Sequence, residues 1–185
     1  MPTVTRTSGL TLVGYFPKNT SVPAAWSASE QVKEICSVSH CVNSPPPDWI
    51  DRWLHNEWGF FNSQQDATSV VPSGCEGFSV FAYRLLPVRF VHGRAERLAI
   101  GDLTVEPMQA AFVSLGFDVV NKVWSVFFEC SPLSCNYMAG EVPVNDFCLV
   151  ADLEQAILLA ERFSREEPEP GPYYVLEVLR EAASA

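Results

Sequence analysis

Two pairs of cysteines with equal spacing are the residues of this chain best suited to chemistry. Cys36 and Cys41 are separated by four residues, and so are Cys130 and Cys135. Four thiolates from two such segments would suit a tetrahedral Zn²⁺ ion, with His40 as a substitute ligand. The gap is wider than in most zinc knuckles, and cysteine is also a common buried apolar residue. Two hypotheses therefore stay open, a zinc site and a set of core thiols.

A cysteine nucleophile is the weaker chemical hypothesis. Cys36 or Cys130 would need a nearby base, and the chain offers His40, His55 and His92. No sequence signature joins a cysteine to a histidine. A Gly-rich phosphate loop, a G-x-S-x-G elbow, an H-E-x-x-H pair and a dinucleotide-binding fingerprint are also absent. These absences argue against the common nucleotide-binding and hydrolase classes, so catalysis is not the favoured function.

A pocket lined by aromatic side chains is a further hypothesis. Three prolines followed by Asp48 predict the start of a tryptophan-rich helix over residues 49–59. Such a helix and the Cys-Ser segments could line a pocket whose candidate residues are Trp49, Trp53, His55, Cys130 and Arg84. The alternative is that the helix covers the core and that the arginine pairs with one of the many carboxylates.

The charge balance indicates which partners the protein can have. The chain has 22 acidic and 12 basic residues, a net charge of −10. This excess argues against nucleic acid and against anionic membranes, because both are bound by clustered Lys and Arg. Within residues 151–185, eight acidic residues against three arginines contribute −5, half of the total. This segment is either a solvated surface or an acidic face for a partner protein with a basic surface.

Composition and segment lengths bound the class of protein. The hydrophobic fraction of 48% supplies enough side chains for one domain that spans residues 1–185. No apolar run reaches about 20 residues, and the first residues lack the pattern of a secretory signal. We therefore expect a cytoplasmic location with reduced thiols. The predicted function is that of an acidic, soluble, non-catalytic protein that binds another protein. The alternative is a small enzyme or ligand-binding protein.

The elements that would position these residues follow from hydrophobic periodicity. Apolar runs predict strands over residues 10–16, 32–38, 78–90 and 173–179, and a hairpin of 110–120 with 123–128. Helices are predicted over 49–59 and 64–71 and from Asp152, where an inward stripe comprises Leu153, Ala156, Ile157, Ala160 and Phe163. The order predicts an α+β fold with a mixed or mainly antiparallel sheet and short helices.

The two halves of the chain show a similar order of parts. Residues 10–90 and 110–180 would each contain a strand, a Cys-Ser segment, a capped helix and a second strand. Gly14 and Gly116 lie 102 positions apart, whereas Ala67 and Ala156 lie 89 apart. A fixed offset is the sign of a repeat, and here the offset drifts. An internal duplication and a chance similarity between the two halves both stay open.

Overall fold

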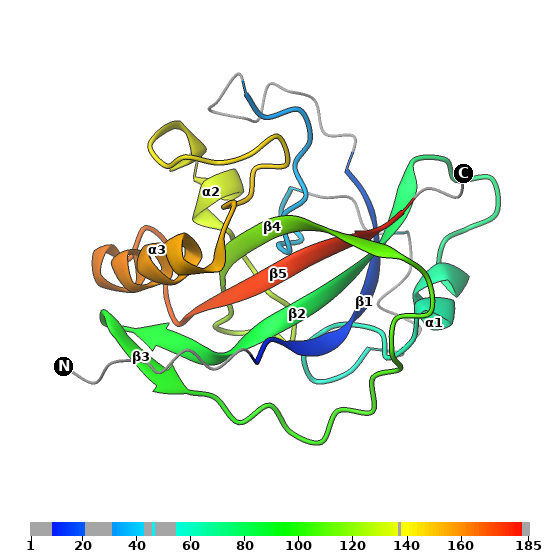
Figure 1. Cartoon of the computed structure of the whole chain (residues 1–185), viewed down its shortest axis with the longest axis horizontal. Coiled ribbons are helices and arrows are strands. Elements are labelled where there is room, and N and C mark those ends of the chain that lie inside the picture. The colour runs from blue at the N-terminus through cyan, green and yellow to red at the C-terminus, as the bar shows by residue number, and fades with distance from the viewer. Residues whose placement is uncertain (1–8, 21–30, 43–45, 47–54, 137, 183–185) are drawn as a thin grey trace.

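The C-terminal strand β5 (Tyr173–Glu181) lies in the interior of an open antiparallel sheet (Figure 1). The computed structural model describes residues 9–20, 31–42, 46, 55–136 and 138–182. Over this part of the chain, five strands form the sheet in the order β1-β2-β5-β4, and β3 pairs with β2. The other strands are β1 (Thr11–Asn19), β2 (Phe78–Val91), β3 (Arg94–Arg97) and β4 (Phe112–Asn121). All of these pairings are antiparallel, whereas the sequence left a mixed and a mainly antiparallel sheet open.

Short helices complete the α+β fold. They are α1 (Gln64–Ser69), α2 (Pro132–Cys135), the 3-10 turn η3 (Met138–Gly140) and α3 (Leu153–Glu166). The predicted caps are confirmed, because the side chains of Ser63 and Asp152 accept backbone N–H groups at the starts of α1 and α3. In α3, Ala156, Ala160 and Phe163 are buried as predicted, and Leu159 joins them.

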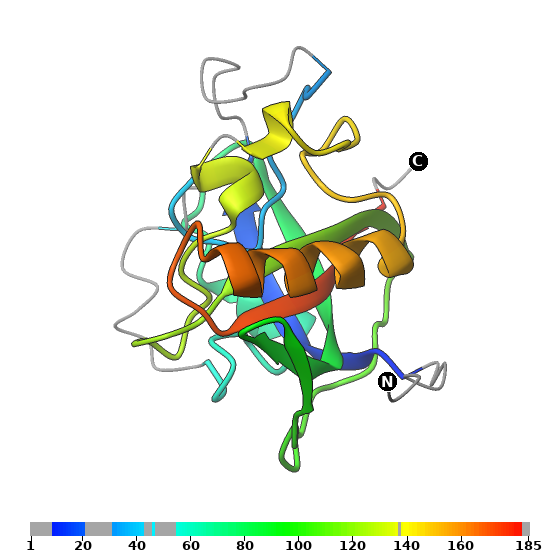
Figure 2. The same cartoon turned by 90° about the vertical axis from the view of Figure 1, so that its left-hand side faces the viewer.

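Both faces of the sheet are covered, which explains the continuous apolar run of β5. Tyr173 and Val175 belong to one hydrophobic cluster together with α3, which lies across that face of the sheet (Figure 2). Tyr174 and Leu176 point the other way, into a second cluster that contains aromatic residues of β1 and of residues 58–61. Successive side chains of a strand alternate between faces, so a strand buried on both sides needs apolar residues throughout.

Two predicted strands are absent from the described residues. Five of residues 32–38 are buried, but the segment is not paired in the sheet, since its N–H groups bond to isolated acceptors. The N–H of Cys36 donates to the carbonyl of Phe147, and that of Val38 donates to the carboxylate of Asp118. Residues 123–128 form a turn rather than the second strand of a hairpin. The carboxylate of Glu129 accepts the N–H groups of Trp124 and Ser125, so these groups are not available for pairing with another strand.

The predicted tryptophan-rich helix is corrected over its described part. Residues 55–59 form a turn, because the side-chain oxygen of Asn56 accepts the N–H groups of Trp58 and Phe60. This side chain competes with helical hydrogen bonding. Trp49 and Trp53 lie outside the described residues.

The strands β1 and β4 are the outermost strands in the order β1-β2-β5-β4. A loop forms an isolated β-bridge with each of them. Tyr15 of β1 exchanges two backbone hydrogen bonds with Phe61, both 2.9 Å long. Phe117 of β4 exchanges two with Val150, of 2.8 and 2.9 Å. Covering an edge in this way blocks pairing with another chain.

Candidate functional site

Three of the four predicted metal-ligating cysteines come together. The sulfur atoms of Cys41, Cys130 and Cys135 all lie within 4.8 Å of one another. Cys41 Sγ and Cys130 Sγ are 3.3 Å apart. Cys36 lies apart from this group and is buried in the core. The fold thus brings the two Cys-Ser segments together and leaves one predicted ligand out.

Local hydrogen bonds fix the position of each sulfur. The N–H of Cys130 donates to Asn121 Oδ1 over 2.7 Å at the end of β4. Cys135 ends α2, where its N–H donates to the carbonyl of Ser131 over 2.7 Å. The N–H of Cys41 donates to Ser39 Oγ over 3.1 Å. Backbone anchors of this kind hold side chains in place before any ligand binds.

A buried carboxylate joins the two Cys-Ser segments. Asp118 is fully buried on β4, and it accepts hydrogen bonds from Ser37 Oγ (2.8 Å) and from the N–H of Val38 (2.7 Å). Its other oxygen accepts from Ser131 Oγ over 2.6 Å. Burial raises the pKa of this carboxyl, and the three donors oppose that effect. The carboxylate therefore sets the spacing between the segments that carry the three cysteines.

A buried lysine holds the first of these segments from β1. The Lys18 ammonium donates to the carbonyl oxygens of Ser37, Val38 and Ser39 over 2.9, 2.6 and 3.0 Å. Burial lowers the pKa of Lys18 to about 7, and the negative charge of Asp118 acts in the opposite direction. Residues 37–39 thus lie between two buried charged groups of opposite sign. The sequence analysis did not find this pair.

The three thiols differ strongly in acidity. Hydrogen bonding from Cys135 is the main cause that lowers the pKa of the exposed Cys41 to about 5. Burial raises the pKa of Cys130 to about 12, and the hydrogen bond to Cys41 raises that of Cys135. Among the three sulfurs, the hydrogen bonds thus favour the thiolate form at Cys41. Sulfur in this state can bind a soft metal ion, attack an electrophile or be oxidised.

The predicted pocket residues are only partly gathered. The ring of His55 packs against Phe127, with centroids 5.0 Å apart, and Phe127 also contacts the ring of His40 at 5.5 Å. Arg84 forms a cross-strand ion pair with Glu177, over 2.8 Å. Three open hollows on the described surface are lined by other residues, and one of about 250 Å³ lies between α3 and residues 141–143. The ligand-pocket hypothesis stays a prediction.

An exposed tryptophan is the surface feature that the sequence analysis missed. The side chain of Trp124 is 90% exposed, and that of Val126 is 42% exposed. The turn that carries them is fixed from inside, since the N–H groups of Trp124 and Ser125 donate to Glu129 Oε1 over 2.7 and 3.0 Å. Assignment of residues 123–128 to a strand hid this turn, because a strand of a hairpin would bury alternate side chains.

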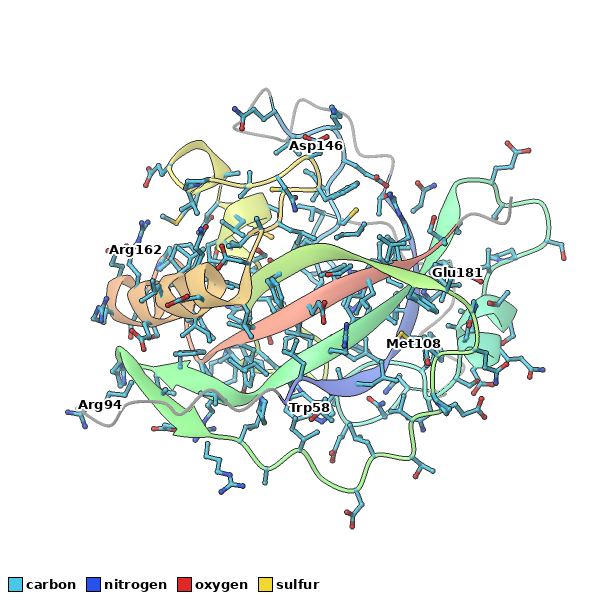
Figure 3. All side chains as sticks on the ribbon, in the orientation of Figure 1. Trp58, Arg94, Met108, Asp146, Arg162 and Glu181 are labelled. Carbon is cyan, nitrogen blue, oxygen red and sulfur yellow. The ribbon has the colours of Figure 1, made fainter. Side chains whose placement is uncertain are left out.

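Several acidic residues of the segment 151–185 lie in α3 or at its two ends. Asp152, Glu154, Glu166 and Glu167 are exposed. Figure 3 shows Arg162 projecting from α3, and its guanidinium pairs with Glu166 over 3.0 Å. Arg162 thus offsets part of the negative charge, and the exposed Arg165 in the last turn of α3 adds a second positive charge.

No protein-family model, curated protein or solved structure matches this chain. None of the helices in the described part of the chain is long and apolar enough to cross a membrane. The function must therefore be argued from the thiol cluster, the buried charges and the surface around Trp124.

Proposed function

We propose that this protein, with its net charge of −10, binds a basic protein partner through a surface centred on Trp124, and that it does so without catalysis. The observation that carries the proposal is the 90% exposure of the Trp124 side chain on a fixed turn. Tryptophan is enriched among the residues that dominate binding energy at protein interfaces.

The turn around Trp124 is ordered in advance of binding. Its base is closed by two backbone hydrogen bonds, from Asn121 to Cys130 over 2.9 Å and from Glu129 to Asn121 over 3.0 Å. Within the turn, the N–H of Phe127 donates to Ser125 Oγ over 3.1 Å. A preformed loop loses less conformational entropy on binding than a flexible one. This order supports a role for Trp124 as an anchor residue.

Near this turn, the carboxylates of Glu57 and Glu129 outnumber the one ammonium recorded there, that of Lys122. The ammonium of Lys122 donates to the carbonyl of Glu57 over 3.2 Å. Burial lowers the pKa of Lys122, while the nearby carboxylates of Glu57 and Glu129 act in the opposite direction. The net charge of −10 adds a long-range attraction for a positively charged protein. Electrostatic steering of this kind raises the association rate and weakens with added salt.

The finer architecture that we propose is an internal duplication of residues 10–90 and 110–180. Two observations support it. The strands β1 and β4 each shift register at a glycine, Gly14 and Gly116. Each strand is then bridged one residue later, by Phe61 and by Val150 respectively. We also propose a reducing, cytoplasmic location, which the six free cysteines support.

Site-specific photo-crosslinking tests the binding function. A photoreactive amino acid replaces Trp124 in one variant and Val113, which is 55% exposed on β4, in a control variant. Illumination in the source cells should give an adduct with one basic protein at position 124 and none at position 113. Raising the salt concentration in a lysate before illumination should reduce the yield.

Affinity measurements with the captured protein complete the test. Trp124→Ser should weaken binding at least 30-fold, the loss of about 2 kcal/mol that is typical of an interface anchor. Val113→Ser should leave the affinity within twofold. An unchanged affinity for Trp124→Ser, or capture that is equal at both positions, would overturn the proposal. Since both side chains are exposed, neither substitution should alter the melting temperature appreciably.

A further inference from the structure

We propose that Cys41, Cys130 and Cys135 form a metal site that holds one thiophilic d¹⁰ ion, Zn²⁺ or Cu⁺, through three sulfur ligands. This inference rests on the thiol cluster and is independent of the protein-binding function. The three residues come from two segments far apart in sequence, and their sulfurs lie within 4.8 Å of one another.

The separations suit a single ion. Sulfur ligands at about 2.3 Å from a tetrahedral zinc ion lie about 3.8 Å apart. Cys41 Sγ and Cys130 Sγ are separated by 3.3 Å, and the widest separation in the group does not exceed 4.8 Å. Small side-chain rotations would bring all three sulfurs to coordinating distance. The backbone around each cysteine would not need to move.

The donor set selects the class of metal. All the members of this group are sulfur donors, and in the described part of the chain no carboxylate or imidazole joins them. Thiolate ligands favour Zn²⁺ and Cu⁺, whereas Ca²⁺ and Mg²⁺ require oxygen ligands. Three sulfurs complete a trigonal Cu⁺ site. For Zn²⁺ they leave a fourth position for water, which can enter beside the exposed Cys41.

Groups around the cluster hold the ligands in place. Ser39 Oγ lies 3.6 Å from Cys135 Sγ, accepts the N–H of Cys41 and donates to the carbonyl of Glu129 over 2.7 Å. The buried carboxylate of Asp118 joins both ligand-bearing segments. Residues that orient metal ligands commonly change affinity by 10–100-fold when they are mutated.

Ordinary packing explains Cys36 and Cys148 better than these three. Cys36 and Cys148 are each 1% exposed inside hydrophobic clusters, as expected for cysteine used as a small apolar side chain. In contrast, Cys41 is exposed, and Cys130 and Cys135 are partly exposed. Three sulfurs gathered at the surface gain little from hydrophobic burial, so coordination is the better reason for their grouping.

Metal titration of the full-length chain tests the site. The metal-free protein, kept reduced with a phosphine, is titrated with Zn²⁺ or Cu⁺ against a chelator of known affinity. We expect one ion per chain by elemental analysis. Co²⁺ as a probe should give a sulfur-to-metal charge-transfer band whose intensity corresponds to three thiolates. Cys130→Ser and Cys135→Ser should each weaken binding at least 100-fold, and Ser39→Ala about 10-fold.

Two control variants define the ligand set. Cys75→Ser removes an exposed cysteine outside the cluster and should leave affinity unchanged. Cys36→Ala should also bind one ion, because Cys36 is not a ligand of the proposed three-sulfur site. A site with four cysteine ligands would instead lose affinity in this variant. Cys41→Ser, at an exposed position, provides a ligand variant in which folding can be verified by circular dichroism. Failure of both metals to bind, binding that survives Cys130→Ser, or loss of binding in folded Cys36→Ala would overturn the proposal. The tighter of the two metals identifies the ion.

Discussion

Asn145 makes, beside β4, the same hydrogen bonds that Asn56 makes beside β1. The amide nitrogen of Asn145 donates to the carbonyl of Leu115 over 2.6 Å, and that of Asn56 donates to the carbonyl of Val13 over 2.9 Å. Each side-chain oxygen also accepts two backbone N–H groups from its own turn, those of Phe147 and Leu149 or those of Trp58 and Phe60. In each turn, the asparagine side chain thus closes the turn and joins it to an outermost strand of the sheet, β1 for Asn56 and β4 for Asn145.

Replacement of either asparagine should therefore cost stability. Asn56→Ala and Asn145→Ala each leave two N–H groups and one carbonyl without their partner. We expect each to lower the free energy of unfolding by about 2–4 kcal/mol, since a buried unsatisfied group costs about 1–3 kcal/mol. Urea denaturation followed by tryptophan fluorescence measures both losses.

The matched control is Asn136→Ala. Asn136 is exposed and makes one side-chain hydrogen bond, to the carbonyl of Pro168 over 2.9 Å. Its loss should cost less than about 1 kcal/mol. Equal losses for all three variants would contradict the role assigned to the two closing asparagines.

Gly116 should not tolerate a side chain. Its φ of +132° is a conformation that other residues rarely adopt, and a Cβ atom would lie 2.7 Å from the carbonyl oxygen of Val150. We expect Gly116→Ala to destabilise the protein by about 3 kcal/mol or more, from backbone strain and overlap together. Gly74→Ala is the control, because Gly74 has a φ of +84° with open space around it. This control should cost about 1–2 kcal/mol, from strain alone. Thermal denaturation of both variants would show whether the close contact matters.

Local chemistry determined most of the elements that the sequence predicted correctly. Ser63 and Asp152, for example, cap helices with their own side chains. The wrong predictions occur where a residue far away in the sequence accepts a hydrogen bond from the backbone. The N–H of Val38 bonds to Asp118, eighty positions away, and no periodicity in residues 32–38 reveals this.

The candidate site was predictable only in part, for the same reason. Equal spacing of the cysteines identified both segments, but it could not exclude Cys36, whose sulfur the fold directs into the core. Lys18 lies in an apolar strand and gave no signal in the sequence, because its three acceptors are carbonyls of another segment. The exposure of Trp124 depends on a turn held by Glu129, and strand propensity favoured the wrong conformation there.

The buried ammonium of Lys18 should give the protein a distinct pH dependence. Burial lowers its folded-state pKa to about 7, while the unfolded chain keeps the ordinary value near 10.5. Between these values the unfolded state binds more protons, so stability contributed by this group rises with pH and is lost as pH falls through 7. Asp118, Tyr83 and the thiols of Cys36, Cys41 and Cys135 also face this group.

Comparison with Lys18→Met isolates the contribution of the ammonium. The variant loses three hydrogen bonds, an offset that does not change with pH. From pH 7 to 9, the wild-type protein should gain stability relative to the variant by up to about 1.4 kcal/mol per pH unit. Guanidinium denaturation of both proteins at pH 7, 8 and 9 measures this slope. A difference that stays constant over this range would show that Lys18 remains fully protonated in the folded state.

Mild oxidation should join Cys41 and Cys130 before any other pair of cysteines. Their sulfurs are 3.3 Å apart, and Cys41 is exposed to an oxidant such as diamide, which takes up the two electrons and two protons released. We expect peptide mapping by mass spectrometry to recover a disulfide between these two residues, with Cys36 and Cys148 still free. Burial excludes the latter two from the reagent and raises the pKa of each to about 12.

Bound metal should change the outcome of this oxidation. An ion held by Cys41 and Cys130 occupies the lone pairs that attack the oxidant, so one equivalent of Zn²⁺ should slow formation of the disulfide. The variant Cys135→Ser provides the control, because it keeps both reacting sulfurs but has only two of the three ligands. Zinc should protect the wild-type protein more than this variant. Equal protection of both proteins would mean that Cys135 takes no part in holding the ion.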